Sequence, residues 1–209
     1  MENLSVLLRA VFVHLSYTVV SVSIGFVLGL LLGILLTRTP RLSGILLPLL
    51  SILNTIPGIV FIGILFLYLG MRPATVIVAL SIYAMFPVLK NTFTGLSCVD
   101  TQYKEAARGC GMNWLQRLYL VELPLAMPTI LGGLRMSTVY TVSWTVLAAM
   151  IGQGGLGDFI YQGVSSNNNE LILQGAVPAA LLAFALGGAV DLLQRRSVTR
   201  GLQKGGDWK

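Results

Sequence analysis

The sequence predicts an all-α membrane protein that forms a single domain over residues 1–209 and crosses the bilayer about five times. Of its 209 residues, 55% are apolar and only 11% are charged, whereas a soluble domain carries roughly 25% charged residues. The mean hydropathy is +0.81. The apolar residues also gather in stretches near the roughly 20 residues that a helix needs to cross about 30 Å of hydrocarbon. A chain so poor in charge is expected to cover much of its surface with lipid.

Five apolar stretches are predicted to span the membrane. They are Leu15–Leu36, Gly44–Leu69, Ala74–Leu89, Met127–Ile151 and Leu173–Leu193. The third stretch is short, and it extends to Leu96 if Lys90 reaches the membrane surface along its own methylene chain or faces a partner. Residues Asn3–Val13 form either an interfacial lead-in or a continuation of the first span.

Two of these spans carry small residues four positions apart. The rows are Gly25, Gly29 and Gly33 on the first span, and Ala179, Ala183 and Gly187 on the fifth. Such rows let helix backbones approach closely in lipid. They serve either packing within this chain or contact with a second subunit.

The basic residues predict the orientation. With the amino terminus placed outside, only Arg9 and Arg72 of the 14 lysines and arginines lie on the outer side. Cytoplasmic segments of membrane proteins carry an excess of lysine and arginine. The carboxyl terminus, with a basic tail at about residues 194–209, is therefore expected in the cytoplasm, which requires an odd number of spans.

Several classes of function are disfavoured. The net charge of +6 does not indicate nucleic-acid binding, because the cations separate apolar stretches instead of clustering with aromatic residues. Cys98 and Cys110 flank a predicted cytoplasmic segment, and the single histidine, His14, lies far away, so neither a disulfide nor a metal site is expected. No nucleophile–base pair indicates an enzyme. We predict a non-catalytic subunit without a cofactor of its own.

Neither of two common nucleotide-binding patterns is expected to form a nucleotide site in this chain. No phosphate-binding loop of the Gly-x4-Gly-Lys type occurs, so the chain is not expected to hydrolyse ATP itself. The segment Gly152–Gly157 formally matches a dinucleotide-binding glycine pattern, but it follows a transmembrane helix where that pattern requires a strand. We interpret it as a turn at the outer end of the fourth span.

The second span contains a predicted break. Asn54, Thr55 and Pro57 lie in a polar, helix-breaking segment at mid-membrane depth. Non-helical backbone at this depth must be buried or line a water-filled cavity. The segment is therefore either part of a translocation pathway or a kink packed against a neighbouring helix.

The fourth span carries polar and aromatic rows. Ser137, Thr141 and Thr145 repeat every four residues, and so do Tyr140 and Trp144. The hydroxyl and aromatic side chains either line a wet pathway, where ring faces attract quaternary ammonium groups, or bond and pack between helices. The candidate pathway set also includes Tyr83 of the third span.

The longest cytoplasmic segment, about residues 97–125, is predicted to contain two helices. Asp100 is a suitable N-cap for a helix that ends at Gly109 or Gly111. Asn113 can cap a second helix, Trp114–Glu122, which is expected to end before Pro124. Its exposed apolar patch is either covered by a partner protein or folded back on the bundle. The patch consists of Trp114, Leu115, Leu118 and Tyr119.

This segment resembles the signature loop of ATP-binding-cassette importer permeases. The matching pattern is Glu105-Ala106-Ala107, three residues, Gly111, nine residues, Val121, one residue, and Leu123-Pro124. The resemblance implies a type I importer permease fold whose loop helices seat in a cleft of an ATPase subunit. The residues implied in this coupling are Glu105, Ala106, Ala107, Gly111, Trp114, Leu118, Leu123 and Pro124.

Further stretches are similar to the quaternary-amine group of these permeases. They are Phe86–Gly95, Val121–Pro128, Ala148–Phe159 and Thr199–Gln203. The resemblance implies import of glycine betaine, carnitine or choline across the bacterial cytoplasmic membrane. The implied partners are two ATPase subunits that bind ATP and magnesium, an extracytoplasmic solute-binding protein, and a second permease that is identical or related.

The sequence leaves two alternative functions open. One is the same role for another small solute, and the other is a stand-alone secondary carrier. Such carriers need buried acids or broken-helix ion sites within the membrane. No carboxylate lies deep in a predicted span, and Asp191 is expected to pair with Arg195 one helical turn away, so the sequence favours an external source of energy.

Overall fold

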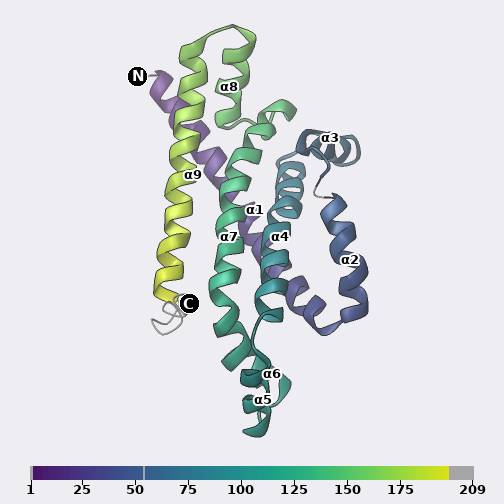
Figure 1. The fold of residues 1–209 in the computed structure, drawn as a ribbon. Coiled ribbons are helices and arrows are strands. Elements are labelled where there is room, and N and C mark those ends of the chain that lie inside the picture. The colour runs from purple at the N-terminus through teal and green to yellow at the C-terminus, as the bar shows by residue number, and fades with distance from the viewer. Residues whose placement is uncertain (1, 54, 198–209) are drawn as a thin grey trace.

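The computed structural model describes residues 2–53 and 55–197, which are almost entirely helical and contain no strand (Figure 1). The elements in chain order are α1 (Glu2–Arg38), α2 (Pro40–Leu53), α3 (Gly58–Leu69), α4 (Pro73–Ser97), α5 (Thr101–Gly109), α6 (Trp114–Arg117), η1 (Leu118–Glu122), α7 (Leu123–Thr145), η2 (Val146–Ile151), α8 (Leu156–Ser165) and α9 (Asn169–Ser197). Asn54, most of the predicted tail and the Thr199–Gln203 match lie outside the described residues. The predicted all-helical class is confirmed.

Four helical segments in the described part of the chain are long and apolar enough to cross a membrane. They are Leu4–Arg38, Pro73–Ser97, Trp114–Ile151 and Asn169–Ser197. They contain the first, third, fourth and fifth predicted spans. The third span takes its longer form, beyond Lys90, and residues Asn3–Val13 continue directly into the first span within α1.

The second predicted span is not one continuous helix. Its residues form α2, with 14 residues, and α3, with 12 residues, which at 1.5 Å per residue are about 21 and 18 Å long. Pro57, whose backbone is extended with φ −57° and ψ 132°, precedes α3 and cannot donate the backbone hydrogen bond that a continuous helix needs. α2 still returns the chain toward the end of the molecule where α4 begins (Figure 1).

The centre of the bundle consists of α1, α4 and α7. α1 crosses α4 and α7 obliquely, and α9 packs on α7 and α8 (Figure 1). A Cβ added at Gly25, Gly29 or Gly33 would come within 2.6–2.7 Å of atoms of α4. This row of glycines therefore serves packing within the chain, where close approach of the two backbones excludes any side chain.

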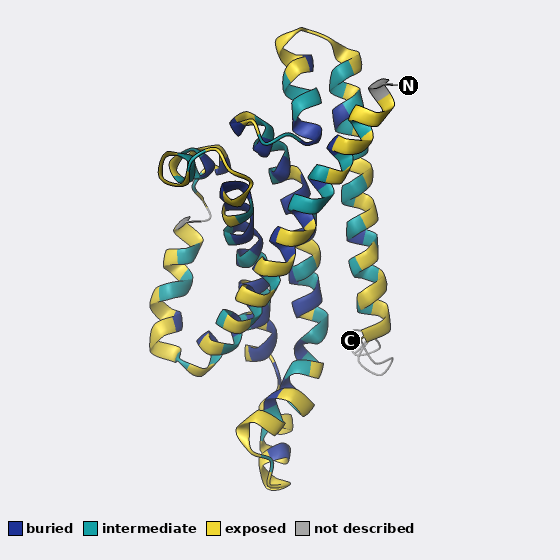
Figure 2. Ribbon diagram, turned by 180° about the vertical axis from the view of Figure 1, so that it is seen from behind, coloured by how far each residue is buried: buried dark blue, intermediate teal, exposed yellow. Residues whose placement is uncertain are grey.

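Exposure divides the molecule into a core and three outlying parts. Buried residues concentrate on α4 and α7, whereas α2, α9 and the α5–α6 end are largely exposed (Figure 2). Many exposed side chains are large and apolar, including Phe184 at 81% and Tyr68 at 84%. Such surfaces suit lipid or another subunit and not water.

The carboxyl-terminal part of α9 is tied to α7 by an ion pair that differs from the predicted one. The Asp191 carboxylate lies 2.7 Å from Nε of Arg135. The prediction that Asp191 pairs with Arg195 is wrong, because packing of α9 on α7 brings Arg135 to the carboxylate while Arg195 is exposed. A contact between helices thus replaces one within a helix.

Candidate functional site

The end formed by α5 and α6 projects beyond the bundle, opposite the end that holds α8 and the amino-terminal part of α1 (Figure 1). Asp100 caps α5 by accepting a 2.9 Å hydrogen bond from the Gln102 amide. Gly111 has φ +76°, a conformation that glycine adopts far more readily than other residues. Asn113 and Gln116 form a reciprocal capping box at the start of α6. The predicted helix–turn–helix is confirmed in both caps and in the turn.

The predicted coupling residues divide into an exposed and a buried group. Five of them are exposed, which are Glu105, Ala106, Gly111, Trp114 and Pro124. Leu123 is half-buried. Ala107 and Leu118 are buried, and Leu118 packs in a cluster with Leu96 and Ile130. The buried group anchors the loop to the bundle, while the exposed group offers a surface.

The apolar patch on this end does not fold back on the bundle, apart from Leu118. Trp114 is 52% exposed and Tyr119 is 64% exposed. Further exposed apolar side chains beside them are Tyr103, Leu115 and Leu120. A contiguous apolar surface in a segment that leaves the bundle indicates contact with another protein.

The second loop helix does not end before Pro124, contrary to the prediction. Residues Trp114–Ile151 form one helical run, which contains the π-helical turn η1 and ends in the 3-10 helix η2. In that turn the Leu123 amide donates to the Leu118 carbonyl, five residues back. Pro124 then occupies the first turn of α7, where a missing amide hydrogen is tolerated. The loop is therefore mechanically continuous with α7.

Glu122 joins the loop to α1. Its carboxylate lies 2.7 Å from Nη2 of Arg38 and 2.8 Å from Nε of Arg117, and the residue is only 2% exposed. The Arg38 guanidinium also lies over the Trp114 ring, 5.8 Å from its centroid. This cluster ties the end of α1 to the start of the α6–α7 run by charge-assisted hydrogen bonds.

The sequence predicts Glu122 only as the end of the second loop helix and does not indicate this cluster. Arg38 is 84 residues away in the chain, so no local pattern indicates the pair. Arg117 and Glu122 are five residues apart, which suits a π-helical turn and not the spacing of three or four that an α-helix would need. The only local signal is an acid at the end of the predicted loop helix, two residues before Pro124.

A second group of predicted residues meets inside the bundle. Tyr83, Pro87, Tyr140, Thr141 and Trp144 line one cavity of about 250 Å³ between α4 and α7. The Tyr83 and Trp144 rings are stacked with centroids 4.1 Å apart. The Phe61 ring meets Tyr83 edge-on at 5.2 Å. Four of the eight candidate pathway residues therefore come together.

The break between α2 and α3 closes against this aromatic group. The Tyr83 hydroxyl donates a 2.8 Å hydrogen bond to the Ile56 carbonyl. Gly58 lies so close to the Trp144 ring that a Cβ there would overlap it. Pro57 directly precedes α3, next to these contacts. Thr55 is exposed, and its hydroxyl donates a hydrogen bond to the Ile52 carbonyl. The break thus packs on a neighbour and also borders a cavity.

The hydroxyl groups of Ser137, Thr141 and Thr145 on α7 form hydrogen bonds within the protein. Thr145 is buried, outside the cavity lining, and its hydroxyl lies 3.1 Å from that of Thr18 on α1. The Thr141 hydroxyl donates to the Ser137 carbonyl, and the Ser137 hydroxyl donates to the Ala84 carbonyl, both at 2.7 Å. The Ser137 and Thr145 hydroxyl groups therefore support contacts between helices, whereas the Thr141 hydroxyl bonds within α7.

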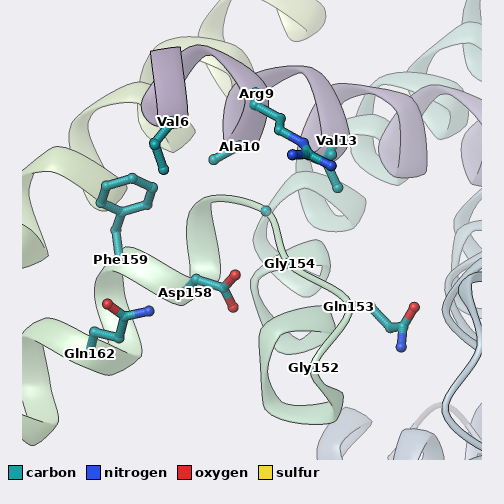
Figure 3. Close-up of a pocket in the computed structure, with 11 residues that line it drawn as sticks. Val6, Arg9, Ala10, Val13, Gly152, Gln153, Gly154, Asp158, Phe159 and Gln162 are labelled. Carbon is teal, nitrogen blue, oxygen red and sulfur yellow. The ribbon is translucent and has the colours of Figure 1, made fainter. Parts of the chain in front are cut away.

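A second hollow, of about 430 Å³ (Figure 3), lies beside α8, at the end of the molecule opposite the loop (Figure 1). It separates the start of α1, which carries Arg9, from the 152–155 turn and α8, which carries Asp158 (Figure 3). Gly152, Gly154 and Gly155 have positive φ, so the glycine segment is a turn, as predicted. Burial raises the pKa of the Asp158 carboxyl above its ordinary value. α8 itself was not predicted.

His14 attaches α1 to α7. Its Nε2 lies 3.0 Å from the Val142 carbonyl, and the nearby Tyr17 hydroxyl donates to the Gln153 carbonyl at 3.4 Å. Across residues 2–53 and 55–197, no group of three or more histidine, cysteine, aspartate or glutamate side chains could hold a metal ion. His14 therefore acts here as a helix contact.

Comparison with known proteins identifies relatives over nearly the whole chain. The family model described as "Binding-protein-dependent transport system inner membrane component" matches residues 25–200. The chain is 35% identical to a choline transport system permease protein of Bacillus subtilis, over 95% of this chain and 91% of that protein. It is 36% identical to a carnitine transport permease protein of Listeria monocytogenes, over 97% and 93% of the two chains.

The fold also matches a solved transporter. A chain from the MetNI methionine ABC transporter, in an inward-facing conformation, superposes with a TM-score of 0.84. The alignment covers 95% of this chain and 99% of that chain at 24% identity. At this identity the match establishes the type I importer permease fold and not the solute.

Proposed function

The chain belongs to the family of binding-protein-dependent transport system inner membrane components, and we propose that it is the membrane-spanning subunit of an ATP-driven importer for a quaternary ammonium osmolyte. The solutes named for its relatives are choline, carnitine and glycine betaine. The observation that carries the proposal is the helix–turn–helix that leaves the bundle with Glu105, Ala106 and Trp114 exposed. This surface suits a protein partner.

In this proposal the exposed face of α5 and α6 seats in an ATPase subunit, which binds ATP and magnesium. A complete importer contains two ATPases, a second permease that is identical or related, and an extracytoplasmic solute-binding protein. The α5–α6 end faces the cytoplasm, as does the carboxyl terminus, and the amino terminus faces outward. This orientation agrees with the distribution of lysine and arginine.

The connection from loop to pathway supports coupling. The α6–α7 run is continuous from Trp114 to Ile151, so displacement of the loop by an ATPase moves the helix that carries Tyr140 and Trp144. The Glu122 ion pair with Arg38 passes the same displacement to α1. Closure of the ATPases on ATP would thus rearrange α1 and α7 together, and with α7 the cavity that it shares with α4.

A stand-alone carrier is the competing function, and the carboxylates argue against it. Glu122 is neutralised by Arg38 and Arg117, and Asp191 is neutralised by Arg135. Both acids lie toward the end of the bundle that carries α5 and α6. Neither is placed as a mid-membrane site for a coupling ion.

The test is uptake by the chain reconstituted in liposomes with its ATPase, its second permease and its binding protein. We expect uptake of labelled choline, carnitine or glycine betaine that requires both ATP and the binding protein. The control is the same liposomes with a catalytically inactive ATPase. Uptake by the permease alone, without ATP, would contradict the proposal and establish a carrier.

A further inference from the structure

We propose that the cavity between α4 and α7 is a binding site for a trimethylammonium cation within the permease itself, separate from the site in the solute-binding protein. The ligand class rests on the proposed function, and this inference adds where in the membrane that ligand is held. The cavity has about 250 Å³ and is lined by five residues, of which Tyr83, Tyr140 and Trp144 are aromatic.

The chemistry of the lining selects the ligand. None of the five lining residues is charged. A cation over the face of an aromatic ring is attracted by the ring quadrupole, and tryptophan and tyrosine are the strongest partners. A primary ammonium would lose hydrogen bonds to water that this lining does not replace. A quaternary ammonium has no N–H group to satisfy, so it suits an uncharged aromatic cavity best.

The rings are held in place before any ligand arrives. The Tyr83 hydroxyl is bonded to the Ile56 carbonyl, and its ring is stacked on Trp144 and met edge-on by Phe61. Trp144 in turn rests on Gly58. A preorganised site loses less entropy when it binds, so this arrangement favours a site over accidental aromatic packing.

One side of the cavity is open. Tyr140 is 52% exposed, whereas Tyr83 is only 8% exposed. Tyr140 can therefore meet an incoming cation while Tyr83 and Trp144 form the wall. Transport requires binding that is weak enough for release, and a wall of neutral rings without a carboxylate meets this requirement.

The site is also adjacent to the chain's helix break. The Ile56 carbonyl, which holds Tyr83, lies between α2 and α3, and Gly58, which contacts Trp144, is the first residue of α3. A rearrangement of this break would move the two rings apart or together. The cavity can thus change its affinity during the transport cycle without any change in charge.

The first test measures binding to the full chain in lipid nanodiscs by equilibrium dialysis with labelled choline. The matched probe is 3,3-dimethylbutanol, which has the shape of choline with carbon in place of the charged nitrogen. We expect choline to bind and the neutral compound to bind at least about threefold more weakly, in line with cation–π energies. Equal binding of both compounds would overturn the proposal.

Variants of Tyr140 test whether choline binds in this cavity. Tyr140→Phe keeps the ring face and should bind choline like the wild type, whereas Tyr140→Leu should bind about threefold to tenfold more weakly. Tyr68→Leu is the matched control, because Tyr68 lies on α3 and is 84% exposed, away from the cavity. Thermal unfolding confirms that each variant folds. Unchanged binding in folded Tyr140→Leu would overturn the site.

A transport measurement separates this inference from the proposed function. In the complete importer with saturating binding protein, Tyr140→Leu should lower the maximal choline uptake rate, and Tyr140→Phe should not. Choline import that is insensitive to Tyr140→Leu overturns the site and leaves the proposed function intact. The opposite result is also possible: choline binds to the chain and needs the Tyr140 ring, but the complete importer transports no quaternary ammonium compound. That result supports the site and overturns the proposed function.

Discussion

The loop end and the aromatic cavity hold their helices together by opposite means. At the loop end, the Glu122 carboxylate joins Arg38 of α1 to Arg117 of the α6–η1 segment. In the cavity, stacked rings and a tyrosine hydroxyl join α4 and α7 to the α2–α3 break. The helices are joined by an ion pair where Arg38 still reaches water. Within the apolar bundle they are joined by neutral contacts, because an unpaired charge is costly there.

The largest effect on stability is expected from breaking the charged junction. Glu122→Gln leaves Arg38 and Arg117 without their counter-charge, and loss of one partner of a buried ion pair costs about 3–5 kcal/mol. Since the Arg38 side chain is 31% exposed, we expect about 2–3 kcal/mol, together with loss of uptake. Thermal unfolding in detergent measures the first quantity, and the reconstituted importer measures the second.

The control for this variant is Asp191→Asn. That carboxylate forms a more exposed pair with Arg135, with side chains 51% and 39% exposed, and such pairs contribute about 0–1 kcal/mol. If the two variants lose the same stability, the junction at Glu122 is not a special contact between the loop and α1.

A smaller effect is expected from disturbing the neutral junction. Gly58→Ala places a methyl group where the Trp144 ring lies, and overpacking of this kind costs about 1–3 kcal/mol. Gly63→Ala on the same helix is the matched control, because no atom lies within 4 Å of its added Cβ. Alanine also favours the helix over glycine by about 1 kcal/mol, so the control should be neutral or stabilising.

Thermal unfolding of the two glycine variants, together with tryptophan fluorescence, provides the measurement. A Gly58→Ala variant as stable as Gly63→Ala would show that α3 moves freely relative to α7. The cavity wall would then not be preorganised, which would weaken the comparison with the charged junction.

Substitution of the glycine in the loop's turn is expected to change stability less than it changes function. Gly111→Ala forces a side chain into φ +76°, at a cost of about 1 kcal/mol. Gly109→Ala, at the end of α5 with open space around its Cβ, should be neutral. We expect Gly111→Ala to lower the uptake per ATP hydrolysed, and equal coupling ratios for the two variants would contradict this role of the turn.

The smallest effect on the folded chain is expected at the exposed face of α5. Glu105→Gln should change the unfolding free energy by less than about 0.5 kcal/mol, because surface substitutions away from structural contacts have little effect. It should nevertheless weaken retention of the ATPase in a pull-down. Glu170→Gln, at the start of α9 on the opposite end, is the matched control, and equal retention in both variants would count against Glu105 as a coupling residue.

Most of the architecture could be predicted from the sequence because its signals are local. The caps at Asp100 and Asn113 act on amides two or three residues away, so a short stretch is enough to place α5 and α6. The break near Pro57 is equally local, since proline lacks a donor. The spans follow from unbroken apolar composition.

The prediction was wrong where a distant contact or an unusual turn intervened. The helix continues through Pro124 because η1 shifts the backbone bonds by one residue. Asp191 bonds to Arg135, across a helix interface, in place of Arg195. α8 went unpredicted because Gly157 falls in the segment interpreted as a turn. In the structure Gly157 lets α8 pack closely on η2, and Gly163 lets it pack closely on α9.

The sequence by itself predicted the membrane class, four of the five spans as long apolar helices, and the loop with its turn at Gly111. These features depend on composition and on neighbours within a few residues. Only the tertiary structure decided that Glu122 is shared by two arginines and that Tyr83, Tyr140 and Trp144 line one cavity. Helix periodicity places a residue on a face, but the angle and depth at which helices cross decide which faces meet.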